Sequence, residues 1–419
     1  MPLPVVIVGA GLAGLSCALQ LHEKDVPFVI CEASDRIGGR ILTDKHQGFT
    51  FDRGFQVLLS AYPECQNVLD YDSLDLHSFY PGALIWVNGR LHKVGDPFRK
   101  PWDCLPTLFA PVGSLVDKIK IAMLRRDLVG MSMDEIFAHR DRQTKAFLGE
   151  YGFSEDIIFR FFQPFLSGVF LERDLRTSSK MFEFIFAMFA RGDACLPAQG
   201  MAAIPAQLAG RLPQGAIRLN SKVHSLQEGL LLVGAGEKIQ ARAIVIATEG
   251  PEAARLLTNF PPVRTHSVTC LYYAAEKPPV SEPILILNGD GHGRVNHVTI
   301  PSNVCPSYAP EGSSLICVSV LGTPFDSEAE ADQIVRAELE LWFKGQASNW
   351  RYLRGYAIND ALPDQAAPLL ESPQRSVKFR PGIYVCGDHR DNGSINGALA
   401  SGRRAGETIV KDIFGAHVI

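Results

Sequence analysis

The glycine spacing near the start of the chain constrains its fold more than any other feature. Gly9, Gly11 and Gly14 form a Gly-x-Gly-x-x-Gly motif, which follows a β-branched run at residues 5–8 and precedes an apolar stretch with helical spacing. Such a run is typical of a parallel strand buried on both faces. The glycines permit a tight turn, a close approach of the backbone to a pyrophosphate, and close helix–strand packing. The sequence therefore predicts the strand, turn and helix that open a dinucleotide-binding fold.

A carboxylate follows at the spacing that this fold requires. Residues 28–31 predict a second strand, and Glu32 and Ala33 come directly after it. In dinucleotide folds an acidic side chain roughly 20 residues past the glycines binds the ribose 2′-hydroxyl. Because a carboxylate repels a 2′-phosphate, an adenosine without that phosphate is favoured.

A second glycine turn favours FAD over NAD. Arg36, Gly38, Gly39 and Arg40 lie just beyond Glu32. Adjacent glycines allow a second close approach of the backbone, and guanidinium groups can neutralise phosphate oxygens in bidentate fashion. We therefore expect FAD. The alternative for this tract is a solvated turn.

The C-terminal region predicts the last cofactor element. Residues 382–386 form a strand pattern that ends at Gly387 and Asp388, and a helix is expected to begin near Ser394. A carboxylate at the strand end can accept hydrogen bonds from the ribityl hydroxyls of a flavin. The positive end of the helix dipole would face the pyrimidine edge of the ring, where negative charge develops on reduction. The alternative is an ordinary turn that closes the sheet.

Composition is that of a sizeable enzyme without a nucleic-acid partner. The chain has 419 residues, of which 46% are hydrophobic, enough to form the cores of two domains or more. Its formal net charge of −4 lacks the excess of basic residues typical of nucleic-acid binding. The 9 cysteines are scattered without a Cys-x-x-Cys pair, so we expect reduced thiols in a cytoplasmic protein, and no metal site. Because the glycine motif begins within the first ten residues, we expect no secretory leader. No apolar run in the sequence reaches the roughly 18 residues of a membrane span.

The predicted fold class is α/β. We expect a Rossmann-like FAD-binding domain assembled from discontinuous segments, with a substrate domain made of a mixed sheet and an inserted helical lobe. Helical spacing predicts helices near residues 112–128, 142–150, 154–166, 177–191 and 327–343, and Asn88-Gly89 predicts a hairpin over residues 84–94. The expected boundaries are 1–95, 196–262 and 371–419 for the FAD-binding domain, 96–195 for the helical lobe, and 263–370 for the sheet-containing part.

Together these motifs resemble the superfamily of flavin amine oxidases, protoporphyrinogen oxidases and carotene desaturases. Within it, residues 52–67 are similar to a tract of plant and cyanobacterial-type carotene (phytoene) desaturases, and residues 394–402 are similar to the closing motif of that group. Gln56 stands where that group carries a histidine. No cysteine lies where a covalent flavin link would be expected in the closing motif, so the resemblance implies non-covalent FAD.

The motifs and the resemblance predict one set of cofactor-binding residues. By resemblance, the backbone of Val223 would contact the adenine. The full set is Gly9, Gly11, Leu12, Ala13, Gly14, Glu32, Ala33, Arg36, Gly38, Gly39, Arg40, Gly54, Phe55, Gln56, Val223, Ala247, Thr248, Gly387, Asp388, Ser394, Ile395 and Ala398.

The expected function is FAD-dependent desaturation of a hydrophobic small molecule, such as an isoprenoid or carotenoid. A hydride would leave a C–H bond for flavin N5, and a proton would leave the neighbouring atom. Oxygen and a quinone are both open as electron acceptors. No catalytic acid or base is assigned, although Arg53, Tyr62, His297 and Tyr356 are polar candidates near the expected domain junction.

Two other functions stay open. One is amine or protoporphyrinogen oxidation; by resemblance, however, Ser394 replaces the aromatic cage residue of amine oxidases, and Thr269 lies near the position of their lysine. The other is a non-catalytic, flavin-binding assembly factor.

Two residue clusters bear on the substrate. Nine phenylalanines predict either an apolar tunnel or the core of the helical lobe; they are Phe159, Phe161, Phe162, Phe165, Phe170, Phe182, Phe184, Phe186 and Phe189. Basic residues interleaved with apolar ones predict either a peripheral membrane face or a solvated helix face; these are Arg99, Lys100, Trp102, Lys118, Ile119, Lys120, Ile121, Met123, Leu124, Arg125 and Arg126.

Overall fold

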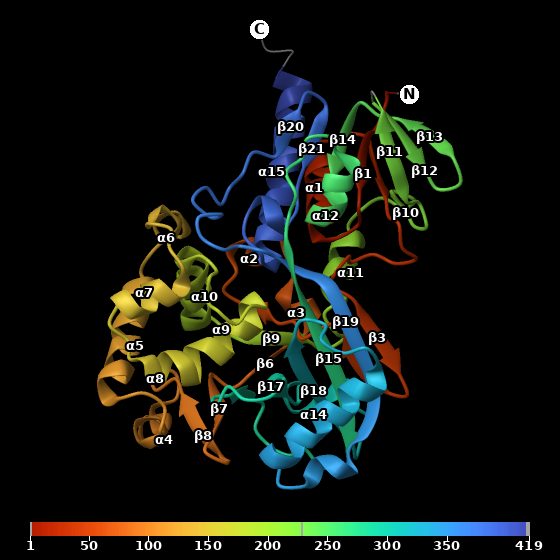
Figure 1. The fold of residues 1–419 in the computed structure, drawn as a ribbon. Helices are drawn as coiled ribbons and strands as arrows, with labels where there is room; N and C mark the ends of the chain where they lie inside the picture. The colour runs from red at the N-terminus through yellow and green to blue at the C-terminus, as the bar shows by residue number, and fades with distance from the viewer. Residues whose placement is uncertain (1, 228, 416–419) are drawn as a thin grey trace.

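The central sheet joins the beginning, middle and end of the chain. The computed structural model describes residues 2–227 and 229–415, and its upper part in Figure 1 contains a six-stranded sheet in the order β10-β2-β1-β14-β21-β20. Strand β1 pairs in parallel with β2 and β14, and β14 pairs in parallel with β21. The strand bounds are Val5–Val8 (β1), Phe28–Cys31 (β2), Ile217–Arg218 (β10), Ala243–Ile246 (β14), Lys378–Arg380 (β20) and Ile383–Val385 (β21). The predicted Rossmann-like sheet built from discontinuous segments is confirmed.

Small residues bring the first and last long helices of this sheet together. Helix α1 (Leu12–Glu23) lies against α15 (Ile395–Phe414). A Cβ at Gly402 would collide with the carbonyl of Ala13, and a Cβ at Gly406 would lie 2.5 Å from Cβ of Gln20. The two glycines therefore allow the helices to pack closely. Helix α11 (Ala203–Ala209) contacts α1, and helix α12 (Gly250–Leu256) contacts the strand that begins at Val223.

Three small sheets surround this core. One contains β11 (Val223–Gln227), β12 (Leu230–Val233) and β13 (Glu237–Gln240); a second contains β3 (Thr43–His46) and β4 (Phe49–Asp52); the third contains β5 (Leu58–Leu59), β9 (Ala194–Pro197) and β6 (Leu76–Ser78). Short helices α2 (Pro63–Val68) and α3 (Tyr71–Leu74) lie between β5 and β6 in the chain.

The lower part of the molecule contains a seven-stranded mixed sheet in the order β19-β15-β18-β17-β16-β7-β8 (Figure 1). Its strands are β7 (Gly82–Val87), β8 (Arg90–Gly95), β15 (Thr265–Ala275), β16 (Leu285–Asn288), β17 (Val295–Thr299), β18 (Ser314–Leu321) and β19 (Arg351–Pro363). Helix α14 (Glu328–Trp342) packs on it through its buried face, and α13 (Pro301–Val304), η3 (Pro306–Tyr308) and η4 (Gln346–Asn349) occupy connections. The mixed sheet and the long helix near 327–343 are confirmed.

The hairpin of β7 and β8 belongs to this second sheet rather than to the dinucleotide-binding part. Its turn is the predicted one, with Asn88 at φ 52° and Gly89 at φ 75°. Strand β7 pairs in parallel with β16, so that Leu84 faces Ile286. The predicted boundary at residue 95 assigned this hairpin to the FAD-binding domain, whereas the structure places it in the seven-stranded sheet. The reason is that β7 pairs with β16, a strand distant in sequence.

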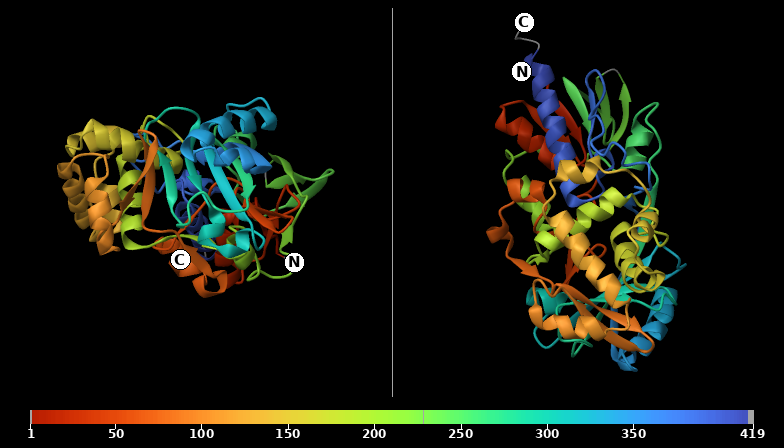
Figure 2. Two further views of the ribbon diagram at one scale, coloured as in Figure 1. Left: turned by 90° about the horizontal axis from the view of Figure 1, so that it is seen from below. Right: turned by 90° about the vertical axis from the view of Figure 1, so that its left-hand side faces the viewer.

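The helical lobe covers the left side of the molecule in Figure 1, and the side view in Figure 2 faces it. It contains η1 (Pro101–Asp103), α4 (Cys104–Phe109), α5 (Leu115–Val129), α6 (Met133–Ala138), α7 (Thr144–Glu150), α8 (Glu155–Ile157), η2 (Ile158–Phe162), α9 (Gln163–Phe170) and α10 (Ser179–Arg191). In the described part of the chain, no helix combines the length and the apolar character needed to span a bilayer.

One predicted helix of the lobe is interrupted. The segment at 154–166 consists of α8, a π-helical turn η2 and the start of α9. At the junction, the N–H of Gln163 donates to the carbonyl of Ile158. Pro164 lacks an N–H, and its ring would crowd the carbonyl four residues earlier in a regular helix, so the wider turn accommodates it.

Candidate active site

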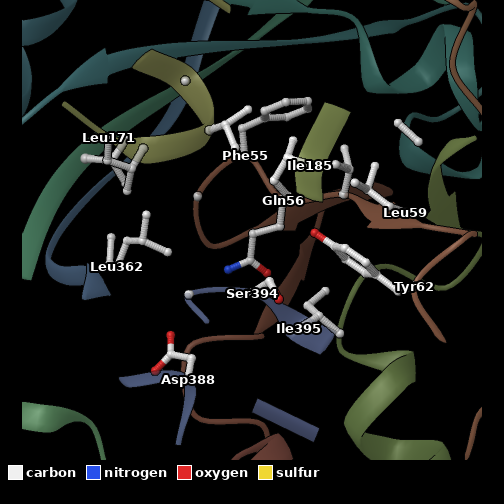
Figure 3. Close-up of a pocket in the computed structure, with 18 of the residues that line it drawn as sticks. Phe55, Gln56, Leu59, Tyr62, Leu171, Ile185, Leu362, Asp388, Ser394 and Ile395 are labelled. Carbon is white, nitrogen blue, oxygen red and sulfur yellow. The ribbon is translucent and has the colours of Figure 1, made fainter. Parts of the chain in front are cut away.

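A cavity of about 860 Å³ lies where the three parts of the molecule meet. One end is lined by the glycine turns around β1, β2 and β21, and its walls continue along β5, α9, α10 and β17 to α5 of the lobe. Figure 3 shows Asp388, Gln56, Tyr62 and Ser394 around this space, with Phe55 and Ile185 on its apolar side. Residues of the six-stranded sheet, the seven-stranded sheet and the helical lobe therefore line the same cavity.

Two glycine turns meet at the dinucleotide end of the cavity. Gly11 forms an isolated parallel bridge with Gly38, and the N–H of Gly38 donates to the carbonyl of Ala10 at 3.0 Å. A Cβ at Gly39 would lie 3.3 Å from Cα of Gly11. The wall here is bare backbone beside the N-terminus of α1, which has no side-chain cap. Such an arrangement of backbone N–H groups and helix dipole fits a pyrophosphate.

Gly14 acts in packing rather than at the cavity surface. It does not line the cavity, and a Cβ on it would collide with the carbonyl of Gly9. Gly9 itself adopts φ 106°, and a Cβ there would lie 2.9 Å from the carbonyl oxygen of Ala247. Both glycines therefore let the turn between β1 and α1 close against β14.

Glu32 is fixed at the carboxyl end of β2. Its Oε2 accepts from the N–H of Ala10 at 2.7 Å, and its Oε1 accepts from the N–H and the hydroxyl of Ser34 at 2.9 and 2.8 Å. The side chain is buried and lines the cavity. A carboxylate held in this way fits the ribose of an adenosine, as its spacing in the sequence predicts.

The two arginines of the second glycine turn take different partners. Arg40 lines the cavity, and its guanidinium pairs with Oδ1 of Asp388 at 2.7 Å. Burial by itself would lower the pKa of Arg40, but the charge and hydrogen bond of Asp388, together with the charges of Glu249 and Asp360, outweigh burial and raise that pKa. Arg36 lies outside the cavity lining and pairs with Asp44 at 2.8 Å. The phosphate contact of Arg36 stays a prediction, and in this arrangement its guanidinium is engaged by Asp44.

Asp44 explains the different fate of Arg36. Its carboxylate is also reached by Arg53 at 3.1 Å and by the hydroxyl of Tyr356 at 2.7 Å. Although burial opposes it, these hydrogen bonds hold the pKa of Asp44 well below its usual range. Tyr356 does not line the cavity, and Arg53 is held by Asp44 at its edge. Neither is placed as an acid or base for a substrate.

The C-terminal turn brings a carboxylate and a helix end to the same wall. Asp388 follows β21, and Ser394 caps α15 by accepting from the N–H of Gly397 at 3.0 Å. Ile395 and Ala398 follow on the first turns of the helix. All of the predicted cofactor residues except Gly14 and Arg36 line the cavity: Gly9, Gly11, Leu12, Ala13, Glu32, Ala33, Gly38, Gly39, Arg40, Gly54, Phe55, Gln56, Val223, Ala247, Thr248, Gly387, Asp388, Ser394, Ile395 and Ala398.

The rest of the cavity is largely apolar. Of the nine phenylalanines, the lining ones are Phe161, Phe162, Phe165, Phe186 and Phe189. Phe165 stacks on Phe161 at 5.9 Å between ring centroids and contacts Phe189 at 5.3 Å. The other members form the buried core of the lobe, apart from Phe159, which is 45% exposed. The cluster therefore serves both as a cavity wall and as a core.

Sequence patterns did not identify several lining residues. Leu171 ends α9 at φ 56°, a left-handed conformation that is uncommon for a non-glycine residue, and Ile185 and Leu362 come from α10 and β19. Nothing in their local sequence separates them from ordinary core residues. The unusual backbone of Leu171 is a property of the folded chain.

His297 is a neutral residue in the cavity wall. The Asn296 amide nitrogen donates to the carbonyl of Pro164 at 3.1 Å, so its contact of 3.0 Å with Nδ1 of His297 makes that ring nitrogen an acceptor. The proton of the neutral ring is then on Nε2, which has no hydrogen-bond partner among the described residues. Burial lowers the pKa of His297 to about 3. It is therefore not a base at neutral pH.

The remaining polar groups of the central cavity are also neutral. Burial raises the pKa of Tyr62 far above the physiological range. Gln56 donates to the carbonyl of Arg40 at 3.0 Å, and Thr269 donates to the carbonyl of Gly322 at 2.8 Å without lining the cavity. Thr269 therefore does not stand in for the lysine of amine oxidases. This part of the cavity can orient and dehydrate a substrate, and the pKa values of Tyr62 and His297 both lie far from 7.

The chain belongs to a known family of flavin enzymes. Residues 12–410 match the family model described as flavin containing amine oxidoreductase, which covers nearly the whole chain. The protein is therefore a flavin-dependent oxidoreductase of this family, and the superfamily resemblance of its motifs is confirmed.

Individual relatives match only in part. Coproporphyrinogen III oxidase of Bacillus subtilis is 27% identical over 180 residues, which cover 40% of this chain and 36% of that protein. Phytoene desaturase (lycopene-forming) of Pantoea ananas is 40% identical over 96 residues, which cover 21% of this chain and 19% of that protein. The chain thus matches about a third or less of the length of these curated relatives.

A solved structure matches over its full length. Cyclohexylamine oxidase from Brevibacterium oxydans superposes with a TM-score of 0.73 at 15% identity, covering 99% of this chain and 100% of that chain. Similarity at this level of identity concerns the fold alone. The α/β fold expected from the resemblance is therefore confirmed.

Proposed function

We propose that this protein binds FAD non-covalently and uses it to desaturate a hydrophobic small molecule. The observation that carries the proposal is the cavity, in which the glycine turns and Asp388 lie at one end of largely apolar walls, with the neutral side chains of Tyr62 and His297 among the lining residues. We assign the adenosine and pyrophosphate to the turns around Gly11, Gly39 and Glu32, and the ribityl chain to Asp388. Residues 1–80, 196–262 and 371–419 would form the FAD-binding unit.

The walls suit a reaction that needs position and dryness more than acid–base catalysis. When bound, FAD supplies an acceptor at N5 for a hydride from a substrate C–H bond. Phe55, Leu59 and Ile185 would exclude water and hold the substrate carbon in place. The accompanying proton from the adjacent atom would pass to the solvent, because Tyr62 stays protonated and His297, with a pKa of about 3, is too weak a base to hold it. The electrons then pass to oxygen or a quinone.

Anaerobic reduction of the purified holoenzyme tests this function. Mixing with isoprenoid polyenes should bleach the visible flavin band, and analysis of the product should show one additional double bond. Bleaching by an amine panel alone would contradict the proposal. Absence of bleaching by any class would favour the non-catalytic assembly factor.

Porphyrinogen oxidation is the second candidate. It is favoured by the 180-residue match to coproporphyrinogen III oxidase, which exceeds the 96-residue match to the phytoene desaturase. Coproporphyrinogen and protoporphyrinogen therefore belong in the same anaerobic panel. Bleaching by a porphyrinogen without bleaching by any polyene would select this candidate instead.

A hydrophobic substrate could enter from a membrane surface, and the protein offers a face for it. The α4–α5 apolar surface consists of Phe98, Trp102, Leu105, Phe109, Leu115, Val116 and Ile119, each more than half exposed. Exposed apolar patches of this kind mark interaction sites. Phe98 also lines the cavity, so the surface adjoins the cavity mouth. Nearby basic side chains, including Lys100 and Arg126, would favour anionic lipids.

Vesicle co-sedimentation tests this docking. Wild-type protein should sediment with vesicles that contain phosphatidylglycerol, and Phe109→Glu should weaken that binding. Leu341→Glu is the matched control, because Leu341 is 71% exposed on α14, outside the lobe. Equal binding by both variants, or none by wild type, would contradict a membrane face.

A further inference from the structure

Cationic side chains gather where the cavity reaches the lobe. Arg99 from the segment after β8 and Lys118 and Arg125 from α5 line it there. Figure 1 labels both β8 and α5. Arg99 pairs with Asp193, and Nε of Arg125 lies 3.4 Å from Oδ2 of Asp96. Each arginine thus has one carboxylate partner, although both also donate to backbone carbonyls.

Lys118 differs from the two arginines. Its Nζ donates to the carbonyls of Leu108 at 2.9 Å and Ala110 at 3.0 Å, which uses two of its three N–H groups. Within the described residues it forms no ion pair. The adjacent Asp117 is occupied, since its carboxylate accepts from the hydroxyls of Ser114 and Ser154. An ammonium group with a free donor therefore lies in the cavity wall.

This charge is partly desolvated. Burial lowers the pKa of Lys118, and Asp117 offsets that effect only in part. The same cavity is lined by apolar side chains such as Val112, Ile121, Phe165 and Phe189. A ligand with an anion at one end would supply the missing partner and fill the apolar length at the same time.

We propose that the substrate is amphipathic: its carboxylate or phosphate end binds Lys118, and its apolar body extends along the phenylalanine-lined walls toward the glycine turns. This assignment rests on the proposed function, because it places the reacting carbon of that hydrophobic substrate at the cofactor end. Lys118 acts as a specificity-determining residue and takes no part in hydride transfer.

A lipid headgroup could offer the same anion, since Lys118 lies on α5 among the residues of the α4–α5 apolar surface. The two sources differ in one respect. An anionic substrate needs Lys118 in lipid-free solution, whereas a headgroup acts only when a bilayer is present.

Matched ligands separate these cases. Geranylgeranoic acid and geranylgeranyl phosphate share an apolar chain with the neutral geranylgeranyl alcohol and the methyl ester. Each is titrated into FAD-loaded protein without lipid, and binding is followed by the change in the visible flavin spectrum. We expect the anionic ligands to bind about tenfold more tightly than the neutral ones.

Variants of Lys118 locate the effect. Lys118→Gln keeps a hydrogen-bond donor for the carbonyls and should remove the anion preference, while Lys118→Arg should retain it. Lys120→Gln is the control, because Lys120 lies on the same helix, is partly exposed, donates to the carbonyl of Gly152 and does not line the cavity. Thermal melts establish that each variant is folded.

The outcomes are distinct. Equal affinities for acid and ester in wild type would overturn the anion assignment and leave the proposed function standing. An anion preference that appears only with vesicles would mean that Lys118 binds lipid headgroups, and it would also overturn the assignment of Lys118 to the substrate. Binding by neither acid nor ester would contradict both the assignment and the hydrophobic substrate.

Discussion

The guanidinium of Arg40 and the carboxylate of Asp388 meet at 2.7 Å, although they come from opposite ends of the chain. The pair lies on the wall of the cavity, where the second glycine turn faces the end of β21. It ties the two halves of the proposed FAD site together, so the geometry of one half depends on the other.

Loss of this pair should weaken FAD binding. Asp388→Asn removes the charge that Arg40 faces and replaces one of the two acceptor oxygens proposed for the ribityl chain with an amide donor, which leaves Arg40 without its ion-pair partner. We expect FAD affinity to fall by about tenfold or more. Flavin content after gel filtration and fluorescence titration of apoprotein with FAD measure this. Retention of full FAD affinity in the variant would argue against the assignment.

Arg36 and Arg40 should differ although the motif presents them alike. Arg36→Gln breaks a part-exposed pair with Asp44, outside the cavity lining, and should leave FAD affinity within about twofold of wild type. Arg40→Gln should lower it by about tenfold or more. Titration of both apoproteins with FAD under the same salt conditions compares them. Equal losses in the two variants would restore the symmetrical role that the sequence predicts.

The glycines of the first turn separate packing from binding. Gly14→Ala places a Cβ against the carbonyl of Gly9 and should destabilise even the apoprotein, by about 1–3 kcal/mol. At Gly11 the nearest atom to an added Cβ is Cα of Gly39 at 3.9 Å, so Gly11→Ala should fold normally. Its methyl group would instead enter the space proposed for the pyrophosphate.

Urea unfolding and FAD titration distinguish the two alanine variants. We expect lower stability without FAD for Gly14→Ala, and normal apoprotein stability with poor FAD binding for Gly11→Ala. Normal FAD binding by Gly11→Ala would place the pyrophosphate elsewhere.

His297 should make the fold sensitive to acid. Its pKa is about 3 in the folded protein and near 6.5 when unfolded, so the unfolded state binds the proton first as the pH falls. The contribution of neutral His297 to the free energy of unfolding is fully present above pH 6.5 and is lost as the pH falls toward 3; about 2 kcal/mol is lost by pH 5. We therefore compare the drop in the free energy of unfolding between pH 7 and pH 5 in the two proteins. This drop should be about 2 kcal/mol smaller in His297→Gln than in wild type.

Comparing the variant with wild type separates the effect of His297 on the pH dependence of stability from the effects of other titrating groups. His389 has a pKa lowered to about 4 by burial and acts in the same direction, whereas Asp391 has a pKa raised to about 6 by burial and acts in the opposite direction. Both are present in wild type and variant alike. An unchanged pH dependence in His297→Gln would mean that the imidazole is not buried in neutral form.

Local spacing predicted much of the cofactor side of the molecule. The turn at Gly9, Gly11 and Gly14 and the position of Glu32 depend on neighbours within one strand–helix unit, so their pattern is readable in the sequence. The π-helical turn η2 is caused by one residue, Pro164, within a segment whose apolar residues have regular helical spacing. That spacing predicted an uninterrupted helix.

The substrate side depends on contacts between distant segments. Leu171, Ile185 and Leu362 meet in the cavity only because α9, α10 and β19 pack around it. Likewise, the pairing of Arg36 with Asp44 follows from competition among several arginines for one carboxylate. Patterns of residue type do not decide such competition, since partner distances appear only in the folded chain.

The central claim is that the cavity holds a hydrophobic substrate for FAD-dependent desaturation. Its most direct test is the anaerobic absorbance spectrum of the holoenzyme mixed with isoprenoid polyenes and isoprenoid acids, with amines and porphyrinogens alongside. We predict that the visible flavin band bleaches with an isoprenoid and that its product gains a double bond. Bleaching by an amine or a porphyrinogen, with no bleaching by any isoprenoid, would contradict the account.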